Sequence, residues 1–328
     1  MNIAEVAKLA GVSPSAVSRY LNNGYLSEEK KEAIRKVIQE TGYRPLVQAQ
    51  ILRTRKTRTV GVILPKIDSF SISNVVAGID SVLDAKGFQI LLADTHNNPE
   101  KELDYLDTFD DQRVDGVILI ATVFTPRHLA ALKNGKLPVV LVGQHLPGFP
   151  CVYHNDYRAF YDMTRLVIGK GRQRLGYIGG LPQDKAVGQE RLRAYRDAVR
   201  EAGLEEQAEH TAVAEFSMRS GYEKARELLE TYGPLDALIC ATDNMAAGAL
   251  QYLHRQGIKV PEQMLLTGQG ASGISEVTTP TITTIRYFYE ESGANAAGLL
   301  LELLEKPNTP AKEIKLGYTI LENESTAL

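Results

Sequence analysis

Hydrophobic residues recur every three to four positions along the first 42 residues and predict three short helices. The first helix is expected to begin at Asn2, where Glu5 can complete a capping box, and to end at Gly11. The second is expected over residues 14–21, with Ser13 as its N-cap. Two short helices joined by a tight, glycine-containing turn are typical of a helix-turn-helix.

A third helix is expected between Ser27, its N-cap, and Gly42, which suits a left-handed position at the helix end. Its apolar stripe consists of Ala33, Ile34, Val37 and Ile38. These three helices predict a small head over residues 1–44. Residues 45–58 mix apolar and basic positions, and because so short a helix is marginal in water, we expect a linker that becomes helical only on a partner.

From residue 59 the pattern changes to short apolar runs that alternate with amphipathic helices. The runs are TVGVIL, FQILLA, DGVILI and PVVLVG, followed by RLGYIGG, ALICATD and MLLTG. Nearly continuous apolar runs predict parallel strands buried on both faces, so the fold class is α/β with two doubly wound lobes. We expect the first lobe at about 59–154 and 286–312, and the second at about 155–285 and 313–328.

Polar residues follow several of these strands, at the edge where such sheets bind ligands in the cleft between two lobes. Gln189 is expected to cap the helix that carries Arg191. Amides, carboxylates, hydroxyls and an arginine fork suit a hydroxyl-rich ligand, and Phe70 offers a stacking face, so a sugar is the expected effector. The candidate effector-binding residues are Lys66, Ser69, Phe70, Ser71, Asp94, Gln144, His145, Arg191, Thr242, Asp243 and Gln269. Asp243 has a second interpretation, as the cap of the next helix.

Charge is divided unevenly between the head and the core. Residues 1–58 contain eleven Lys and Arg against five Asp and Glu, a net charge of +6, whereas the whole chain carries −3. The remaining residues therefore carry −9. Because nucleic-acid phosphates attract a segregated basic excess, the head and linker are expected to bind double-stranded DNA in a salt-dependent way.

Motifs of common enzyme classes are missing from the sequence. There is no HExxH, no GxSxG, and no GxxxxGK followed by Ser or Thr. The six His are scattered, and Cys151 and Cys240 are isolated in strand-like segments, so neither a metal site nor a disulfide is expected. No signal peptide or apolar run long enough to span a membrane stands out. We expect a cytoplasmic protein that is not an enzyme and needs no cofactor or membrane.

The segments IAEVAKLAGVSPSAVSRYLNN and TGYRP resemble the head of the lactose/galactose repressor family of bacterial transcription regulators. The rest of the chain resembles the periplasmic sugar-binding architecture. The resemblance implies that helix 14–21 enters the major groove, that the hinge after Pro45 becomes helical on DNA, and that Leu52 is a minor-groove wedge. The expected DNA-binding residues are Ser13, Pro14, Ser15, Ser18, Arg19, Asn22, Tyr43, Gln50, Leu52 and Arg53.

Within the family, Arg191 matches the arginine that grips the effector. The segments PKIDSFSIS, GFPCVYHND, SMRSGYE and ALICATDNMAAGALQYL look most like the trehalose-operon repressor branch. That branch implies a disaccharide or its phosphate, which Lys66 and Arg191 could meet. Gln144, however, stands where the branch has an arginine, and Gly270 stands where the family has an aspartate. A sugar and a sugar phosphate therefore both remain open.

Two classes of function follow from these patterns. The first is a homodimeric repressor of a carbohydrate-utilisation operon, which reads a pseudo-palindromic operator and responds to a small sugar or sugar phosphate. The alternative is a cytosolic sugar-binding or sugar-processing protein with an accessory basic head. An operator complex that responds to sugar would separate the two.

Overall fold

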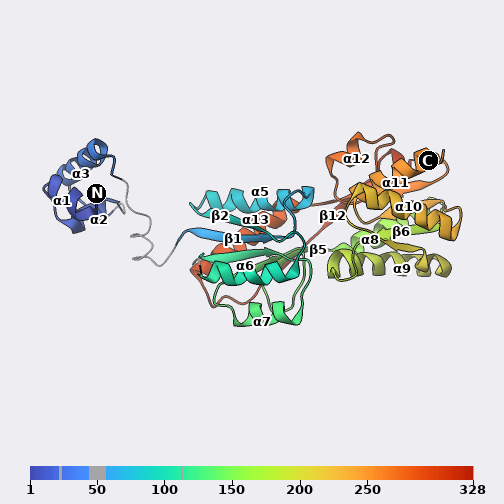
Figure 1. The fold of residues 1–328 in the computed structure, drawn as a ribbon, viewed down its shortest axis with the longest axis horizontal. Coiled ribbons are helices and arrows are strands. Elements are labelled where there is room, and N and C mark those ends of the chain that lie inside the picture. The colour runs from blue at the N-terminus through green and yellow to red at the C-terminus, as the bar shows by residue number, and fades with distance from the viewer. Residues whose placement is uncertain (22–23, 44–56, 112–113, 328) are drawn as a thin grey trace. The chain divides into compact units, whose positions relative to one another are not determined.

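The computed structural model describes residues 1–21, 24–43, 57–111 and 114–327. The chain divides into two units, residues 1–57 and residues 58–328 (Figure 1). Four predicted DNA-binding residues lie outside the described residues: Asn22, Gln50, Leu52 and Arg53. The proposed hinge helix lies there as well.

The first unit contains the three predicted helices, α1 (Ile3–Leu9), α2 (Pro14–Leu21) and α3 (Glu28–Thr41). They share a small core in which Val6, Val17 and Ile34 are fully buried. Because these side chains repeat at helical spacing, one face of each helix is covered by the other two. The hydrophobic pattern of the head is thus confirmed.

The ends of these helices follow the sequence signals with one exception. Asn2 and Glu5 form the predicted capping box, with hydrogen bonds of 3.0 and 2.9 Å, and Gly11 adopts a φ of 65°. Ser13 Oγ accepts a hydrogen bond from the amide of Ala16 at 3.2 Å. Ser27 occupies the N-cap position of α3, but its side chain makes no capping hydrogen bond. Ser27 therefore lies at the predicted N-cap position, but the capping hydrogen bond that we predicted for its side chain does not form.

The first lobe of the second unit is built on a parallel six-stranded sheet in the order β11-β5-β4-β3-β1-β2. Its strands are β1 (Thr59–Leu64), β2 (Gln89–Asp94), β3 (Gly116–Ile120), β4 (Val139–Val142), β5 (Cys151–His154) and β11 (Glu313–Leu316). One face is covered by α5 (Phe70–Asp84) and α13 (Tyr289–Glu305), and the other by α6 (Pro99–Asp111) and α7 (Pro126–Asn134) (Figure 1). Buried apolar side chains on both faces explain the continuous apolar runs.

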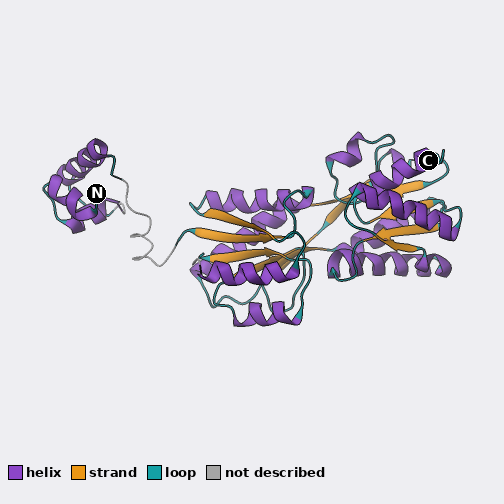
Figure 2. Cartoon of the chain, in the orientation of Figure 1, coloured by secondary structure: helices purple, strands orange, loops and turns teal. Residues whose placement is uncertain are grey.

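The second lobe has a parallel four-stranded sheet in the order β7-β6-β8-β9. The strands are β6 (Leu175–Gly179), β7 (Thr211–Val213), β8 (Ala237–Cys240) and β9 (Leu265–Thr267). Helices α8 (Asp156–Gly169) and α9 (Arg191–Glu201) pack together, as do α10 (Met218–Tyr232) and α11 (Asp243–Arg255), while α12 (Gly273–Val277) is a short extra turn. Figure 2 shows the strands of this lobe between these two pairs of helices.

Two strands near the C-terminus, β10 (Thr284–Tyr287) and β12 (Tyr318–Leu321), form a separate antiparallel pair. Between them the chain returns to the first lobe, because β11 pairs in parallel with β5. The sequence pattern predicts residues 313–328 in the second lobe, whereas residues 313–316 belong to the sheet of the first. The paired residues Cys151 and Glu313 are 162 positions apart in the sequence (313 − 151), and the pattern of neighbouring residues cannot indicate such a pairing.

The strand predicted from FQILLA also differs from expectation. Strand β2 lies at the edge of its sheet, where Leu91 and Leu92 are 39% and 40% exposed. The prediction that it is buried on both faces is wrong, because sheet order decides which strand lies at the edge.

Among the residues that the structure describes, no helix combines the length and hydrophobicity needed to cross a membrane.

Candidate effector site and nucleic-acid-binding face

A cavity of about 250 Å³ lies between the two lobes, at the carboxyl ends of their parallel strands. Nine of the eleven predicted effector residues line it. They are Lys66, Ser69, Phe70, Ser71, Gln144, Arg191, Thr242, Asp243 and Gln269. A cleft between two doubly wound lobes is where a small ligand is expected, so we treat this cavity as the candidate effector site.

Arg191 is the centre of the hydrogen-bond network in this cavity, although only 5% of the residue is exposed. Its Nε donates to Asp156 Oδ1 at 2.7 Å, and its Nη1 donates to the Ala241 carbonyl at 2.8 Å and to Gln269 Oε1 at 2.9 Å. The guanidinium carbon also lies 5.0 Å from the ring centre of Phe160. These contacts fix the plane of the guanidinium and leave Nη2 without a partner among the described residues.

The approach to Arg191 is an unusual turn. Residues Lys185–Glu190 form a π-helical segment that continues into α9, and Asp184 caps it by accepting the amide of Val187 at 2.9 Å. Gln189 is therefore not the cap that we predicted; its side chain donates to the Pro182 carbonyl at 2.7 Å. Wide turns of this kind are frequent at functional sites.

Gln144 and Asp184 connect the two lobes across the cavity. Gln144, which follows β4, donates through Nε2 to Asp184 Oδ1 at 2.8 Å and to the Thr122 carbonyl at 3.1 Å. Burial raises the pKa of the Asp184 carboxyl, although hydrogen bonds from Val187 and Gln144 oppose that shift. A side chain of the first lobe thus donates one of the hydrogen bonds that a buried acid of the second lobe accepts.

Asp243 has a role other than the helix cap that we considered. Thr242 caps α11, since its side chain accepts the amide of Met245 at 3.2 Å. Asp243 instead accepts hydrogen bonds from Ser272 Oγ at 2.9 Å and from Thr284 Oγ1 at 2.6 Å. Burial raises the pKa of its carboxyl, and these hydrogen bonds oppose the shift. They hold the loop after β9 against the start of α11.

Lys66, Ser69, Phe70 and Ser71 line the cavity from the first lobe. Lys66 Nζ lies 3.2 Å from Asp68 Oδ1, and Ser69 Oγ lies 3.1 Å from Ser71 Oγ. Helix α5 begins at Phe70, so Ser71 and the exposed ring of Phe70 belong to its first turn.

Two predicted effector residues do not line the cavity. Asp94 accepts the amides of Ile67 at 3.2 Å and His96 at 2.8 Å, so it shapes the loops after β1 and β2. His145 Nε2 lies 2.9 Å from Glu313 Oε2, a residue of β11. Asp94 is the last residue of β2 and His145 follows β4, as the sequence predicts. Each side chain nevertheless contacts a backbone or side-chain partner that the sequence does not indicate.

Sequence reasoning missed His154, Asp156, Tyr287 and Tyr289, which also line the cavity. His154 stacks on Tyr287 with ring centres 4.5 Å apart, and Tyr287 donates its hydroxyl to Asp156 Oδ1 at 3.0 Å. Tyr289 accepts a hydrogen bond from Gln269 Nε2 at 2.6 Å. Two sequence features could have indicated these residues: the segment HND (residues 154–156), which follows an apolar run, and the segment YFY (residues 287–289), which precedes a helix. Both segments cross between the lobes.

His154 provides a pH-dependent prediction. Burial lowers its pKa from 6.5 to about 4, with the nearby Arg191 acting in the same direction and Asp156 against it. The neutral ring is therefore favoured by folding, and stability present above pH 6.5 is lost as the pH falls toward 4. We expect His154 to account for about 3 kcal/mol of the unfolding free energy lost between pH 7 and pH 4, at about 1.36 kcal/mol per pKa unit.

Urea unfolding of the wild type and of His154→Phe at both pH values tests this contribution. Phenylalanine keeps an aromatic ring beside Tyr287 but cannot bind a proton. Between pH 7 and pH 4, the free energy of unfolding of the variant should fall by about 3 kcal/mol less than that of the wild type. An equal loss of unfolding free energy in the two proteins would contradict the assignment of this pH dependence to His154.

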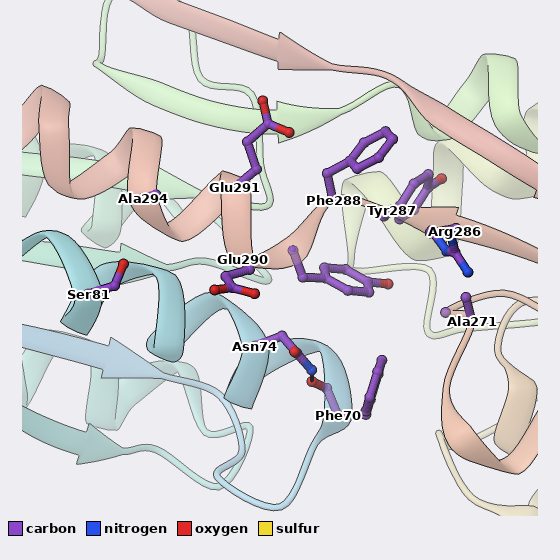
Figure 3. Close-up of a pocket in the computed structure, with 12 residues that line it drawn as sticks. Phe70, Asn74, Ser81, Ala271, Arg286, Tyr287, Phe288, Glu290, Glu291 and Ala294 are labelled. Carbon is purple, nitrogen blue, oxygen red and sulfur yellow. Dashed lines mark hydrogen bonds between the residues drawn. The ribbon is translucent and has the colours of Figure 1, made fainter.

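A second, more open hollow of about 540 Å³ adjoins the cavity and shares Phe70, Gly270, Tyr287 and Tyr289 with it. Figure 3 shows Asn74 and Ser81 on one helix, α5, and Glu290, Glu291 and Ala294 on α13. Phe70 and Phe288 are 48% and 38% exposed. Of the predicted effector residues only Phe70 lines this hollow, whereas nine line the polar cavity.

The predicted DNA-binding residues of the head lie mainly on one exposed side of α2 and its N-terminus. Ser13, Pro14, Ser15 and Arg19 are exposed, and Ser18 is half-buried. Tyr43 differs, because only 8% of it is exposed and it packs with the core of the head. The burial of Tyr43 therefore favours a packing role for its ring over the predicted DNA contact.

Comparison with known proteins gives two family matches. Residues 2–45 match the model described as bacterial regulatory proteins, lacI family, and residues 164–326 match a periplasmic binding protein-like domain. The chain is 34% identical over 309 residues to the sucrose operon repressor of Staphylococcus xylosus, covering 93% of this chain and 94% of that protein. It is 30% identical over 328 residues to the transcriptional regulator RegA of Clostridium saccharobutylicum, covering 99% of each.

Among solved structures, the chain is similar to that of a transcriptional regulator CelR–cellobiose complex. The match has a TM-score of 0.77 and 27% identity, and covers 99% of each chain. These relatives do not distinguish the trehalose-operon branch, so that part of the resemblance stays a prediction.

Proposed function

Because the chain belongs to the lacI family of bacterial regulatory proteins, we propose that it represses a carbohydrate-utilisation operon under the control of a small sugar or sugar phosphate. The observation that carries this proposal is the polar cavity around Arg191 in a chain that also has a basic helix-turn-helix head. The sugar-regulator names of the relatives support the same class of ligand.

The proposed DNA partner is a pseudo-palindromic operator bound by a homodimer. One small head offers too little contact for useful specificity, whereas two heads can read two half-sites. The exposed residues of α2 are proposed to contact bases and phosphates. The segment after Pro45 is proposed to become helical on DNA, with Leu52 as a minor-groove wedge. Such a regulator works in the cytoplasm, where the operator is.

We propose a binding role without catalysis for the core. The relatives are regulators, and the polar groups of the cavity are arranged around one another in a network that suits recognition of hydroxyl groups. The alternative, a sugar-processing protein with a basic head, would require turnover of a sugar. Incubation of the purified protein with candidate sugars, followed by chromatography, would detect such turnover.

The test of the proposed function is an operator-binding experiment. Selection from random duplexes should yield a pseudo-palindrome, and fluorescence anisotropy should then give an affinity that falls steeply with salt. A sugar that binds the core should change that affinity by about 5- to 150-fold, the usual range of allosteric coupling. Selection of no preferred sequence, or an affinity that no tested sugar changes, would count against the proposal.

Arg19→Ala should weaken binding to the selected operator by about 1–3 kcal/mol, because Arg19 is exposed on the proposed recognition helix. Arg35→Ala is the matched control, since Arg35 is an exposed arginine of α3 that pairs with Glu32. Equal losses for the two variants in anisotropy titrations would show that α2 has no special part in recognition.

A further inference from the structure

The charges that line the effector cavity bear on whether its ligand carries a phosphate. Six side chains with a formal charge line the cavity: Lys66, Asp68, Asp156, Asp184, Arg191 and Asp243. Four are acids and two are bases, so the lining has a formal charge of −2. A phosphate group would add further negative charge to a site that is already acidic.

Both bases are already paired with acids of the same cavity. Arg191 Nε lies 2.7 Å from Asp156 Oδ1, and both side chains are more than nine-tenths buried. Lys66 Nζ lies 3.2 Å from Asp68 Oδ1, and half of the Lys66 side chain is exposed. A phosphate at Lys66 would therefore compete with both a carboxylate and water for a single mobile ammonium group.

The two remaining acids have no basic partner among the described residues. Asp184 accepts hydrogen bonds from Gln144 and Val187, both through Oδ1, and Asp243 accepts from Ser272 and Thr284. Hydrogen bonds from amides and hydroxyls stabilise the ionised carboxylate. Burial acts the other way and raises the pKa of both carboxyls, and Arg191 lowers that of Asp184 without forming an ion pair with it. When ionised, each acid adds a negative charge that no ion pair among the described residues neutralises.

The unused hydrogen-bonding capacity of the cavity matches hydroxyl groups. Asp184 Oδ2 and Gln144 Oε1 have no partner among the described residues and can accept, while Arg191 Nη2 can donate. A sugar hydroxyl both donates and accepts, whereas a phosphate dianion can only accept. Two of these three positions require a donor from the ligand.

Helix N-termini at the cavity favour an anion, and three of them are capped by side chains of the protein itself. Asn155, Asp184 and Thr242 cap α8, the π-helical segment before α9, and α11 with their own side chains. Helix α5 has no such hydrogen bond at Ser69, but Asp68 immediately precedes it. Helix α13, whose first turn brings Tyr289 and Ser292 to the cavity, has no side-chain cap either. The acid, amide and hydroxyl caps of the other three helix ends therefore offset part of the positive potential at the cavity.

We propose that the cavity selects an uncharged, hydroxyl-rich sugar and discriminates against its phosphorylated form. This inference rests on the proposed function, since it specifies the ligand of the same site. The proposed contacts are hydroxyl donation to Asp184 and Gln144 and donation from Arg191. Selection against the phosphate follows from the two acids that lack a basic partner, because unpaired like charges reject a ligand.

The experiment compares matched ligand pairs on the full-length protein by isothermal titration calorimetry at about physiological ionic strength. The pairs are glucose, sucrose, cellobiose and trehalose, each with its 6-phosphate. Inorganic phosphate serves as a control for anions that bind the basic head. For the sugar that binds, we expect the unphosphorylated form to bind at least about tenfold more tightly, because like-charge contacts are strongly unfavourable.

Asp184→Asn tests the origin of the discrimination. It should weaken binding of the uncharged sugar and reduce its preference over the phosphate by about tenfold, because one uncompensated charge is gone. Asp236→Asn is the matched control: Asp236 precedes β8, at the end of the strand opposite Asp243, and also accepts backbone amides. The ratio of the two affinities within each variant does not depend on how stably that variant folds.

The outcomes separate this inference from the proposed function. Tighter binding of a 6-phosphate, with an operator affinity that responds to it, would overturn the inference and leave the function intact. An unchanged ratio in Asp184→Asn would overturn the assignment of that acid. If no sugar of either kind binds or alters operator affinity, the proposed function and the inference both fail.

Discussion

Replacing Arg191 with alanine is expected to abolish the sugar response and to lower the free energy of unfolding by about 3–5 kcal/mol. The stability loss follows because the Asp156 carboxylate stays buried without the guanidinium that now lies 2.7 Å away. The loss of response follows because Arg191 orients Gln269 and presents its Nη2 to the cavity. Urea unfolding and operator titration with and without sugar measure the two effects.

A variant without either charge separates binding from folding. Asp156→Asn combined with Arg191→Met removes the unpaired charge, so it should recover much of the stability that Arg191→Ala loses. It should still bind operator and still fail to respond to sugar. A normal sugar response in this double variant would show that the cavity around Arg191 is not the effector site.

Gly293→Ala is expected to destabilise the first lobe by about 3 kcal/mol or more. Gly293 lies where α13 crosses α5, and a Cβ there would overlap the carbonyl oxygen of Val75. The clash involves backbone on both sides, so no side chain can move to relieve it. The two helices would have to separate, which would also shift Ser292 and Tyr289 at the cavity wall.

Gly298→Ala, in the same helix, is the control with the opposite sign. A Cβ on Gly298 would meet no atom within 4 Å, so alanine should stabilise the helix by about 1 kcal/mol. Thermal unfolding of the wild type and the two variants at one pH gives the change in unfolding free energy for each substitution. Destabilisation of similar size in both would mean that close packing of α5 on α13 is not what Gly293 provides.

The head shows how far local sequence signals reach. Asn2, Glu5 and Gly11 act on backbone groups within a few residues, and each was predicted with its interaction. Ser27 occupies the predicted cap position without its hydrogen bond, so even a local signal defines the end of a helix more reliably than the contact that forms there.

The candidate effector cavity was predictable as far as it follows from the positions of the strands along the chain. Gln144, Thr242 and Gln269 come directly after apolar runs, and parallel strands carry their carboxyl ends to one edge. Asp94 and His145 satisfied the same criterion but do not line the cavity. Asp94 instead accepts the amide of His96, and His145 pairs with Glu313. Position after a strand indicates the edge of the sheet but not the direction of the side chain.

The sequence by itself determined the helix-turn-helix head, the alternation of strands and helices in the core, and Arg191 as a cavity residue. The first two depend on periodicity and on hydrogen bonds between near neighbours, whereas Arg191 was indicated by its match to the family's effector-binding arginine. Only the tertiary structure decided that β2 is an edge strand, that β11 belongs to the first lobe, and that Asp156 pairs with Arg191. Each of these depends on which distant segments become neighbours, because burial and charge pairing are properties of the packed chain and not of the local pattern.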